Sequence, residues 1–334
     1  MTKVLILAYH FHPSEAVAAR RATAYAKHLY HYGIHPTIIT HQYNEAGKII
    51  TQNNPPKVEN HKHYKLIRLA QHPSTQTQWL HSSKKSTFFR KFVLIIQWAF
   101  GVLDVAGQND HSYWRFKEFL FPHVKTTHYD YCIGIFNPHF TLKLAYCLNK
   151  KFNLPYVLDF RDLWSDHLFK SNPKLTFAEK IQDYITRWYW KKWIRQSKSY
   201  SITSEEWLSI LNKMSGKSGH VIRNGFEDEL LTIKADKTSY FSVGCMGTFY
   251  KNQDLETFLF GLRQFLESLD HQNKKHIKLS CLGLSTNYRS QIQKEITDII
   301  STENVEFLPR TDGLRAFEFC KSQTILWHPT FPDA

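Results

Sequence analysis

Charged side chains follow directly on a short apolar run near the middle of the sequence. The run Tyr156-Val157-Leu158 is entered through Pro155 and ends in Asp159-Phe160-Arg161-Asp162. Such a run is typical of a strand buried in a parallel sheet, and open α/β sheets bind ligands beyond the carboxyl ends of their strands. The two carboxylates and the guanidinium could bind a polar substrate there, or they could form an ion-pair network that closes the strand. Spacing alone leaves both interpretations open.

A histidine stands at a second predicted strand-to-helix turn. Residues 130–136 predict a strand, and His139 opens a helix that continues through Lys151. A lone histidine in this place is often a capping or packing residue. Because parallel strands end at one edge of their sheet, His139 is nevertheless expected beside the charged run. Two such turns at one edge favour a functional role for His139.

The N-terminal residues predict a third turn of the same kind. Residues 3–9 are a predicted strand, and a helix is expected from Glu15 to Tyr32, where Gly33 closes it. A strand followed at once by a helix N-terminus presents backbone N–H groups to an anion. The dinucleotide-binding pattern G-x-G-x-x-G does not occur at this turn.

The chain of 334 residues is strongly basic, with a net charge of +14 and a pI of ≈ 9.4. This charge indicates an anionic partner, which could be nucleic acid, anionic lipid or a phosphorylated substrate. The five cysteines are widely spaced without a C-x-x-C pattern, which favours the reducing cytosol. The N-terminus does not resemble a signal peptide. Two histidine pairs, 10/12 and 61/63, each lack a nearby third ligand, so no metal site is predicted.

Basic and aromatic residues gather between positions 84 and 100. An apolar, aromatic-rich stretch from Phe88 to Phe100 begins with lysines and arginines. Such a stretch can lie in a membrane interface, or it can be a core helix with a basic start. We slightly favour the core helix, although its basic start counts against it because cations are disfavoured at a helix N-terminus. The residues that would face the membrane are Lys84, Lys85, Arg90, Lys91 and Trp98.

Predicted strands and helices alternate along the whole chain, which indicates an α/β protein with parallel sheets. A first domain is expected over residues 1–225, a polar linker over 226–240, and a second domain over 241–334. The aromatic-rich helix near 177–195 is expected to pack in the core or between the domains. The sequence stops just past a predicted strand, so we expect the second domain to be incomplete.

Six segments, in this order, carry a resemblance to a known family. They are L-I-L-A-Y-H-F-H-P-S-E-A-V-A-A-R-R-A-T-A-Y-A-K-H-L from residue 5, N-P-H-F-T-L-K-L-A from 137, P-Y-V-L-D-F-R-D-L-W from 155, S-I-T-S-E from 201, V-I-R-N-G-F from 221 and G-T-F-Y-K-N-Q-D from 247. Together they resemble the retaining glycosyltransferases of family 4. The resemblance implies the GT-B fold, in which two Rossmann-like domains face each other across a cleft.

The resemblance also implies roles for particular residues. The N-terminal domain would bind the acceptor, and the C-terminal domain the nucleotide-sugar. The implied residues are catalytic His139, acceptor-side Ser14, Glu15, Asp159, Arg161 and Asp162, and donor-binding Gly247, Thr248, Lys251 and Arg310. Fixed cations and N–H groups would stabilise the leaving diphosphate, which gains charge as the glycosidic bond breaks. No metal or other cofactor is expected, because lysine and arginine can supply that charge and no Asp-x-Asp motif occurs.

The sequence departs from the family pattern in two places. Thr248 stands where the family commonly has an arginine, and the donor-site pair of glutamates is absent. We favour a truncated chain as the explanation, because the predicted fold also stops early. The alternative is a non-catalytic, membrane-docked subunit of GT-B type that lacks a complete donor site.

The resemblance predicts a hexosyltransferase that retains the anomeric configuration and acts in bacterial surface polysaccharide biosynthesis (lipopolysaccharide, capsule or exopolysaccharide). The expected partners are a nucleotide-sugar donor, a lipid-linked or oligosaccharide acceptor and an anionic membrane surface. The expected location is cytoplasmic and peripheral, at the inner face of the cell membrane. Nucleic acid is not an expected partner, because the sequence holds no recognition motif for it.

Overall fold

The computed structural model describes residues 1–14, 16–45, 47–52, 54–71, 110–165, 175–247, 249, 254–284 and 289–328. These residues form two compact units, and the chain passes from the first to the second after Asn224. The predicted boundary lay at 225. The predicted membrane-facing residues at 84–98 lie outside the described residues.

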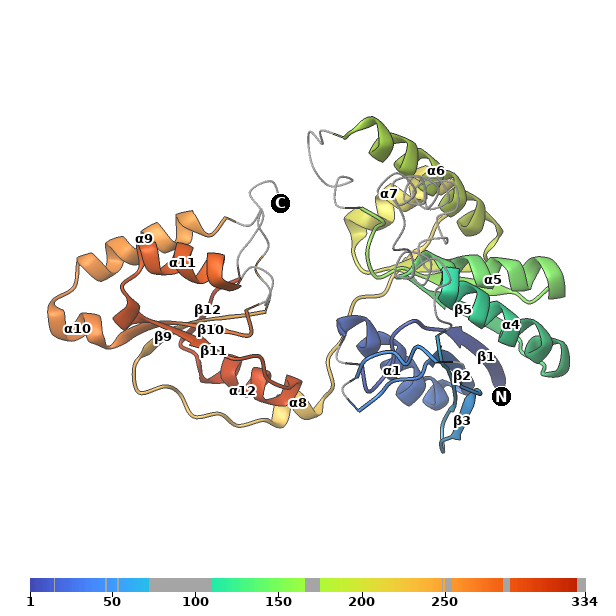
Figure 1. Ribbon diagram of the computed structural model, residues 1–334, viewed down its shortest axis with the longest axis horizontal. Coiled ribbons are helices and arrows are strands. Elements are labelled where there is room, and N and C mark those ends of the chain that lie inside the picture. Colours follow the sequence, from blue (N-terminus) through green and yellow to red (C-terminus); the bar gives the residue numbers. More distant parts are fainter. Residues whose placement is uncertain are drawn as a thin grey trace, which may run out of the picture. The chain divides into compact units, whose positions relative to one another are not determined.

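The first unit is built on an eight-stranded sheet with the order β3-β4-β2-β1-β5-β6-β7-β8 (Figure 1). Every neighbouring pair is parallel except β3 with β4. The parallel sheet predicted from the alternation of strands and helices is therefore confirmed. The strands are β1 (Thr2–Leu7), β2 (Ile34–His41), β3 (Lys57–Asn60), β4 (Lys65–Leu69), β5 (Tyr131–Ile135), β6 (Tyr156–Asp159), β7 (Ser199–Ile202) and β8 (His220–Val221).

Helices cover both faces of this sheet. They are α1 (Val17–His28), α4 (Asp110–Thr126), α5 (His139–Phe152), α6 (Phe177–Gln196) and α7 (Glu205–Ser215). Right-handed crossovers place α1 on one face and α4 to α7 on the other, because the strand order runs in opposite directions from β1. The predicted first helix is shorter than expected: α1 gives way to a 3₁₀ turn at Leu29–Tyr32, which Gly33 ends with a φ of 72°.

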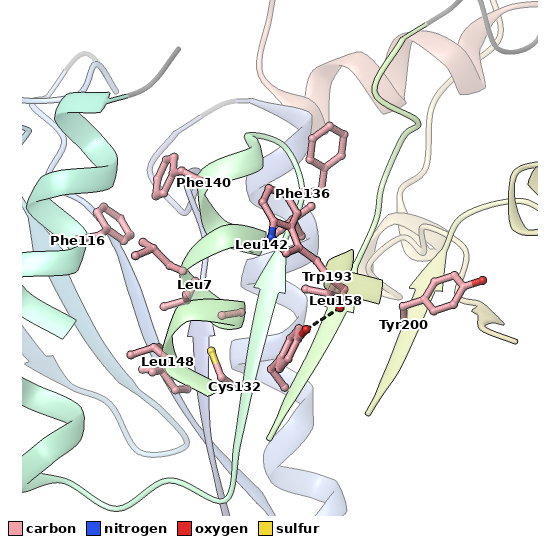
Figure 2. Close-up of a cluster of buried hydrophobic side chains, with 14 of the residues drawn as sticks. Leu7, Phe116, Cys132, Phe136, Phe140, Leu142, Leu148, Leu158, Trp193 and Tyr200 are labelled. Atoms are coloured by element: carbon pink, nitrogen blue, oxygen red, sulfur yellow. Dashed lines mark hydrogen bonds between the residues drawn. The ribbon is translucent and has the colours of Figure 1, made fainter. Parts of the chain in front are cut away.

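The larger hydrophobic core lies between the sheet and helices α4 to α7. Figure 2 shows Phe116 of α4 and Phe140 of α5 on neighbouring helices, and both belong to the core cluster that includes Leu7 of β1. Trp190 and Trp193 of α6 are also fully buried, and the carbonyl of Trp193 accepts a 2.6 Å hydrogen bond from the Tyr156 hydroxyl. A smaller core on the opposite face packs the alanines of α1 against β1 and β2. Short side chains let that helix lie close to the sheet.

The second unit has a four-stranded parallel sheet with the order β11-β10-β9-β12. Its strands are β9 (Phe241–Met246), β10 (Ile277–Leu282), β11 (Val305–Leu308) and β12 (Ile325–Leu326). Its helices are α8 (Glu229–Thr232), α9 (Glu256–Glu267), α10 (His271–Lys275), α11 (Arg289–Ile299) and α12 (Gly313–Ser322), with a 3₁₀ turn at Thr302–Asn304. Helix α8 lies inside the segment predicted as a linker. No helix in the described ranges combines the length and apolarity needed to cross a bilayer.

Candidate functional site

Three neighbouring strands of the first sheet end side by side. β5 pairs with β1 on one side and with β6 on the other, all parallel. Their carboxyl ends therefore meet at one edge, where β1 leads to Ser14, β5 to His139 and β6 to Arg161. The predicted meeting of these turns at one edge follows from this strand order. Glu15, predicted beside Ser14, lies outside the described residues.

His139 is the first residue of α5 and lies in an aromatic environment. Its ring centroid is 5.0 Å from that of Phe136 and 5.7 Å from that of Trp190. Burial lowers the pKa of His139 to about 3, because the imidazolium would lose its hydration there. The Trp190 indole donates a 3.0 Å hydrogen bond to Nδ1. An accepting Nδ1 on a neutral ring assigns the proton to Nε2, so His139 is an N–H donor at neutral pH.

A second histidine lies at the same edge, in the turn after β1. His10 Nδ1 is 3.3 Å from Ser14 Oγ. The pKa of His10 is lowered, first by burial and second by the positive charge of Arg161. The His10 ring and the Arg161 guanidinium therefore lie within electrostatic reach of each other. The sequence pattern did not single out His10 for this site, because a histidine in a loop carries no positional signal of its own.

Asp159 is buried in an ion pair and is only 1% exposed. Arg21 donates hydrogen bonds from Nε and from Nη2 to the two carboxylate oxygens of Asp159, and both distances are 2.6 Å. The hydroxyls of Ser201 and Tyr25 donate two further hydrogen bonds, of 2.6 and 3.0 Å. For Asp159 the structure thus corresponds to the ion-pair interpretation, with Arg21 of α1 as the partner in place of Arg161. An acceptor-binding role for this carboxylate stays a prediction.

Arg21 is the residue that the sequence interpretation missed. It also donates from Nη1 to the carbonyl of Ile222, at 2.9 Å, and to Oδ1 of Asn224, at 3.3 Å. One guanidinium thus joins α1, the end of β6 and the last residues of the first unit. The available signal was its place one residue before Ala22, which puts it beside the small-residue stripe of α1 that faces the sheet.

Arg161 and Asp162 remain near the surface, unlike Asp159. Arg161 Nε donates a 2.7 Å hydrogen bond to Asp162 Oδ2, and both side chains keep part of their surface exposed. The Arg161 carbonyl accepts a 2.7 Å hydrogen bond from Thr203, which fixes the backbone of this loop. A partly exposed guanidinium held in this way can bind a carboxylate or phosphate with two parallel hydrogen bonds.

The predicted donor residues belong to the second unit. Gly247 follows β9 with a φ of 109°, and a Cβ added there would meet nothing within 4 Å. Gly283 follows β10, and its backbone lies beside that of Arg310, which follows β11. Because β9, β10 and β11 are parallel neighbours, these residues share one edge of the second sheet. Thr248 and Lys251 lie outside the described residues.

Candidate metal ligands do not gather anywhere in the described part of the chain. None of those ranges contains a group of three or more His, Cys, Asp or Glu side chains that could hold a metal ion.

Comparison with known proteins identifies the fold. No family model matches the chain, and no curated protein matches it in sequence. Among solved structures, sucrose-phosphate synthase from Thermosynechococcus elongatus is similar, with a TM-score of 0.60 at 13% identity over 98% of this chain and 75% of that one. Trehalose-6-phosphate synthase OtsA gives 0.62 at 10% identity over 97% and 78%, and TarM gives 0.56 at 10% over 98% and 80%. The chain has the GT-B fold. Membership of family 4 stays a prediction.

Proposed function

We propose that this protein is a glycosyltransferase that moves a sugar from a nucleotide-sugar donor to an acceptor with retention. The observation that carries the proposal is the match of 97–98% of the chain to sucrose-phosphate synthase and trehalose-6-phosphate synthase. Both units take part in that match, and each has a sheet edge with residues suited to a polar, anionic substrate.

In this proposal the first unit binds the acceptor at the edge formed by β1, β5 and β6. Neutral His139 donates from Nε2 to a sugar oxygen and does not act as a base, because a pKa of about 3 makes the ring a very weak one. Arg161 binds an anionic or hydroxyl-rich group next to it. Asp159 and Arg21 act below this surface as positioning residues, because their ion pair holds the end of β6.

The second unit binds the nucleotide diphosphate in this proposal. Gly247 leaves room for phosphate oxygens to approach the backbone. Arg310 supplies positive charge at the same edge, which favours departure of the nucleotide diphosphate as its charge grows. Lysine and arginine can provide this stabilisation without a metal ion.

The finer assignment is a hexosyltransferase of family 4 that acts in bacterial surface polysaccharide biosynthesis. We place it at the inner face of the cell membrane, with a lipid-linked or saccharide acceptor. The ordered sequence motifs and the net charge of +14 support this assignment, because lipid-diphosphate acceptors and their membranes are anionic.

A screen of UDP- and GDP-sugars with the native full-length protein tests the proposal. Transfer to an acceptor, or slow hydrolysis of one nucleotide-sugar, is the expected result, and Arg161→Ala should reduce it. Arg20→Ala serves as the matched control, since Arg20 is an exposed arginine of α1. Nucleotide binding without any sugar transfer or hydrolysis would instead support the non-catalytic subunit.

A further inference from the structure

Helices α4, α5 and α6 share one outer surface, which faces away from the first sheet. α4 packs against α5, and α5 packs against α6. The inner sides of the three helices carry core residues such as Phe116, Leu144 and Trp190. Their opposite sides therefore form one continuous surface, which we call the basic–aromatic face. Its residues are Trp114, Lys117, Phe121, Lys143, Tyr146, Lys150, Lys151, Phe177, Lys180, Tyr184, Trp188, Lys191 and Lys192.

Large aromatic rings on this face are open to solvent. The exposed fractions are 80% for Phe177, 72% for Tyr184, 51% for Trp188 and 52% for Trp114. The three residues of α6 recur at helical spacing opposite the buried Trp190, so they form a stripe. An ordinary protein surface exposes apolar residues singly. Four large exposed rings gathered on adjoining helices indicate a binding surface instead.

Lysines are interleaved with the rings, and several reach from one helix to the next. Lys143 Nζ of α5 lies 4.6 Å from the ring centroid of Tyr113 in α4, and Lys151 Nζ lies 4.8 Å from that of Phe121. Lys192 Nζ of α6 lies 5.4 Å from Tyr146 in α5 and 5.0 Å from Trp188. The cations and rings thus form a single array across the three helices.

Acidic side chains do little to neutralise this face. The sequence of α5 contains no Asp or Glu. In α6, Asp183 is engaged by Arg187 and by the Trp164 indole, and Glu179 bonds to Thr176 in a capping box. Glu118 lies on α4. The lysines outnumber these carboxylates, so the face is positively charged.

We propose that the basic–aromatic face docks on the surface of a bilayer that contains anionic lipids. Trp and Tyr rings favour the headgroup region of a membrane, and lysines beside them bind lipid phosphates while their alkyl chains cover apolar surface. The phosphates of duplex nucleic acid could pair with the lysines, but a duplex offers no apolar surface that would bury the exposed rings. This inference rests on the proposed function, which places the protein at a membrane, and it names the surface that would make the contact. The vesicle measurement below nevertheless reports docking whether or not sugar is transferred.

Cosedimentation with lipid vesicles tests the docking face. The native protein should bind vesicles of phosphatidylcholine with phosphatidylglycerol, should bind pure phosphatidylcholine weakly, and should dissociate as salt is raised. Lys150→Ala, Lys151→Ala and Lys192→Ala together should weaken binding about a hundredfold, since each lysine contributes about fivefold at an anionic surface. Tyr184→Ser should weaken it further.

The matched controls remove the same groups elsewhere in the first unit. Arg20→Ala, Lys57→Ala and Lys62→Ala together remove three exposed cations, and Tyr32→Ser removes a similarly exposed ring. Equal losses for the face variant and its control would overturn the proposal, because net charge alone would then explain binding. Failure to bind anionic vesicles would overturn it as well, as would single-stranded nucleic acid that binds at this face in their place. Sugar transfer to a soluble acceptor should stay unchanged in the lysine variant.

Discussion

The edge of the first sheet has a buried ion pair with charged side chains next to it at the surface. The edge of the second sheet has glycines in the corresponding turns. Asp159 and Arg21 are almost fully buried, and Arg161 and Asp162 lie next to them at the surface. In the second unit, Gly247 and Gly283 follow their strands with φ values of 109° and 72°. The first edge is thus suited to recognition by side chains, and the second to close approach of a ligand to the backbone.

The largest expected effect is the loss of stability in Arg21→Ala. This change leaves the buried Asp159 carboxylate without its bidentate partner, which costs about 3–5 kcal/mol in the free energy of unfolding. Arg20→Ala, the exposed neighbour, should stay within about 0.5 kcal/mol of the native protein. Chemical denaturation of both variants checks this. Equal stabilities would mean that the first edge does not depend on its buried ion pair.

Arg161→Ala should have the opposite profile to Arg21→Ala. The Arg161–Asp162 pair is partly exposed, so its loss should cost no more than about 1 kcal/mol in unfolding. Loss of a charged hydrogen bond to substrate should lower kcat/KM about ten- to a hundredfold. Steady-state kinetics and thermal melting together decide the matter. A large fall in melting temperature with intact transfer would assign Arg161 a structural role.

Acidification should destabilise the native protein through His139. Its pKa in the folded state is about 3, below the value of about 6.5 in the unfolded chain, so the unfolded chain takes up a proton first as the pH falls. This contribution is almost fully present above about pH 7. Between about pH 7 and pH 5 it should decrease by about 2 kcal/mol. Denaturation curves for His139→Gln should lack that part of the pH dependence, and an unchanged dependence would refute the buried neutral ring.

Glycine substitutions at the second edge should change stability less than the loss of the buried ion pair does. Gly247→Ala places a side chain at a positive φ and should cost about 1–2 kcal/mol. Its larger consequence should be weaker binding of nucleotide diphosphates, measured by thermal shift. Gly261→Ala in the exposed part of α9 is the control and should stabilise the protein by up to about 1 kcal/mol. Equal nucleotide binding by the two variants would contradict backbone recognition at the second edge.

The fold was accessible from the sequence because alternating apolar strands and amphipathic helices constrain a parallel sheet strongly. The antiparallel edge strand β3 was not predicted, since its four residues, K-V-E-N, are mostly polar and form a strand only by pairing with β4. The aromatic side chains of helix α6 differ in burial, and the composition of the helix did not reveal which of them face the core. Trp190 and Trp193 are buried, whereas Trp188 is half-exposed.

The candidate site was predictable only in outline. Strand ends placed His139 and Arg161 at one edge, because that follows from parallel topology alone. The partner of Asp159 did not follow, because Arg21 is distant in sequence and lies on a helix that crosses the other face of the sheet. Likewise, the tautomer of His139 depends on the hydrogen bond from Trp190, and no local pattern predicts that contact.

The bonds that Arg21 makes beyond Asp159 bear on how the chain can bend. Its guanidinium holds the carbonyl of Ile222 and the side chain of Asn224, at the last residues of the first unit. Arg21 thereby ties that stretch to Asp159 at the end of β6. The ion pair that supports one sheet edge therefore also fixes the path of the chain up to the end of the first unit.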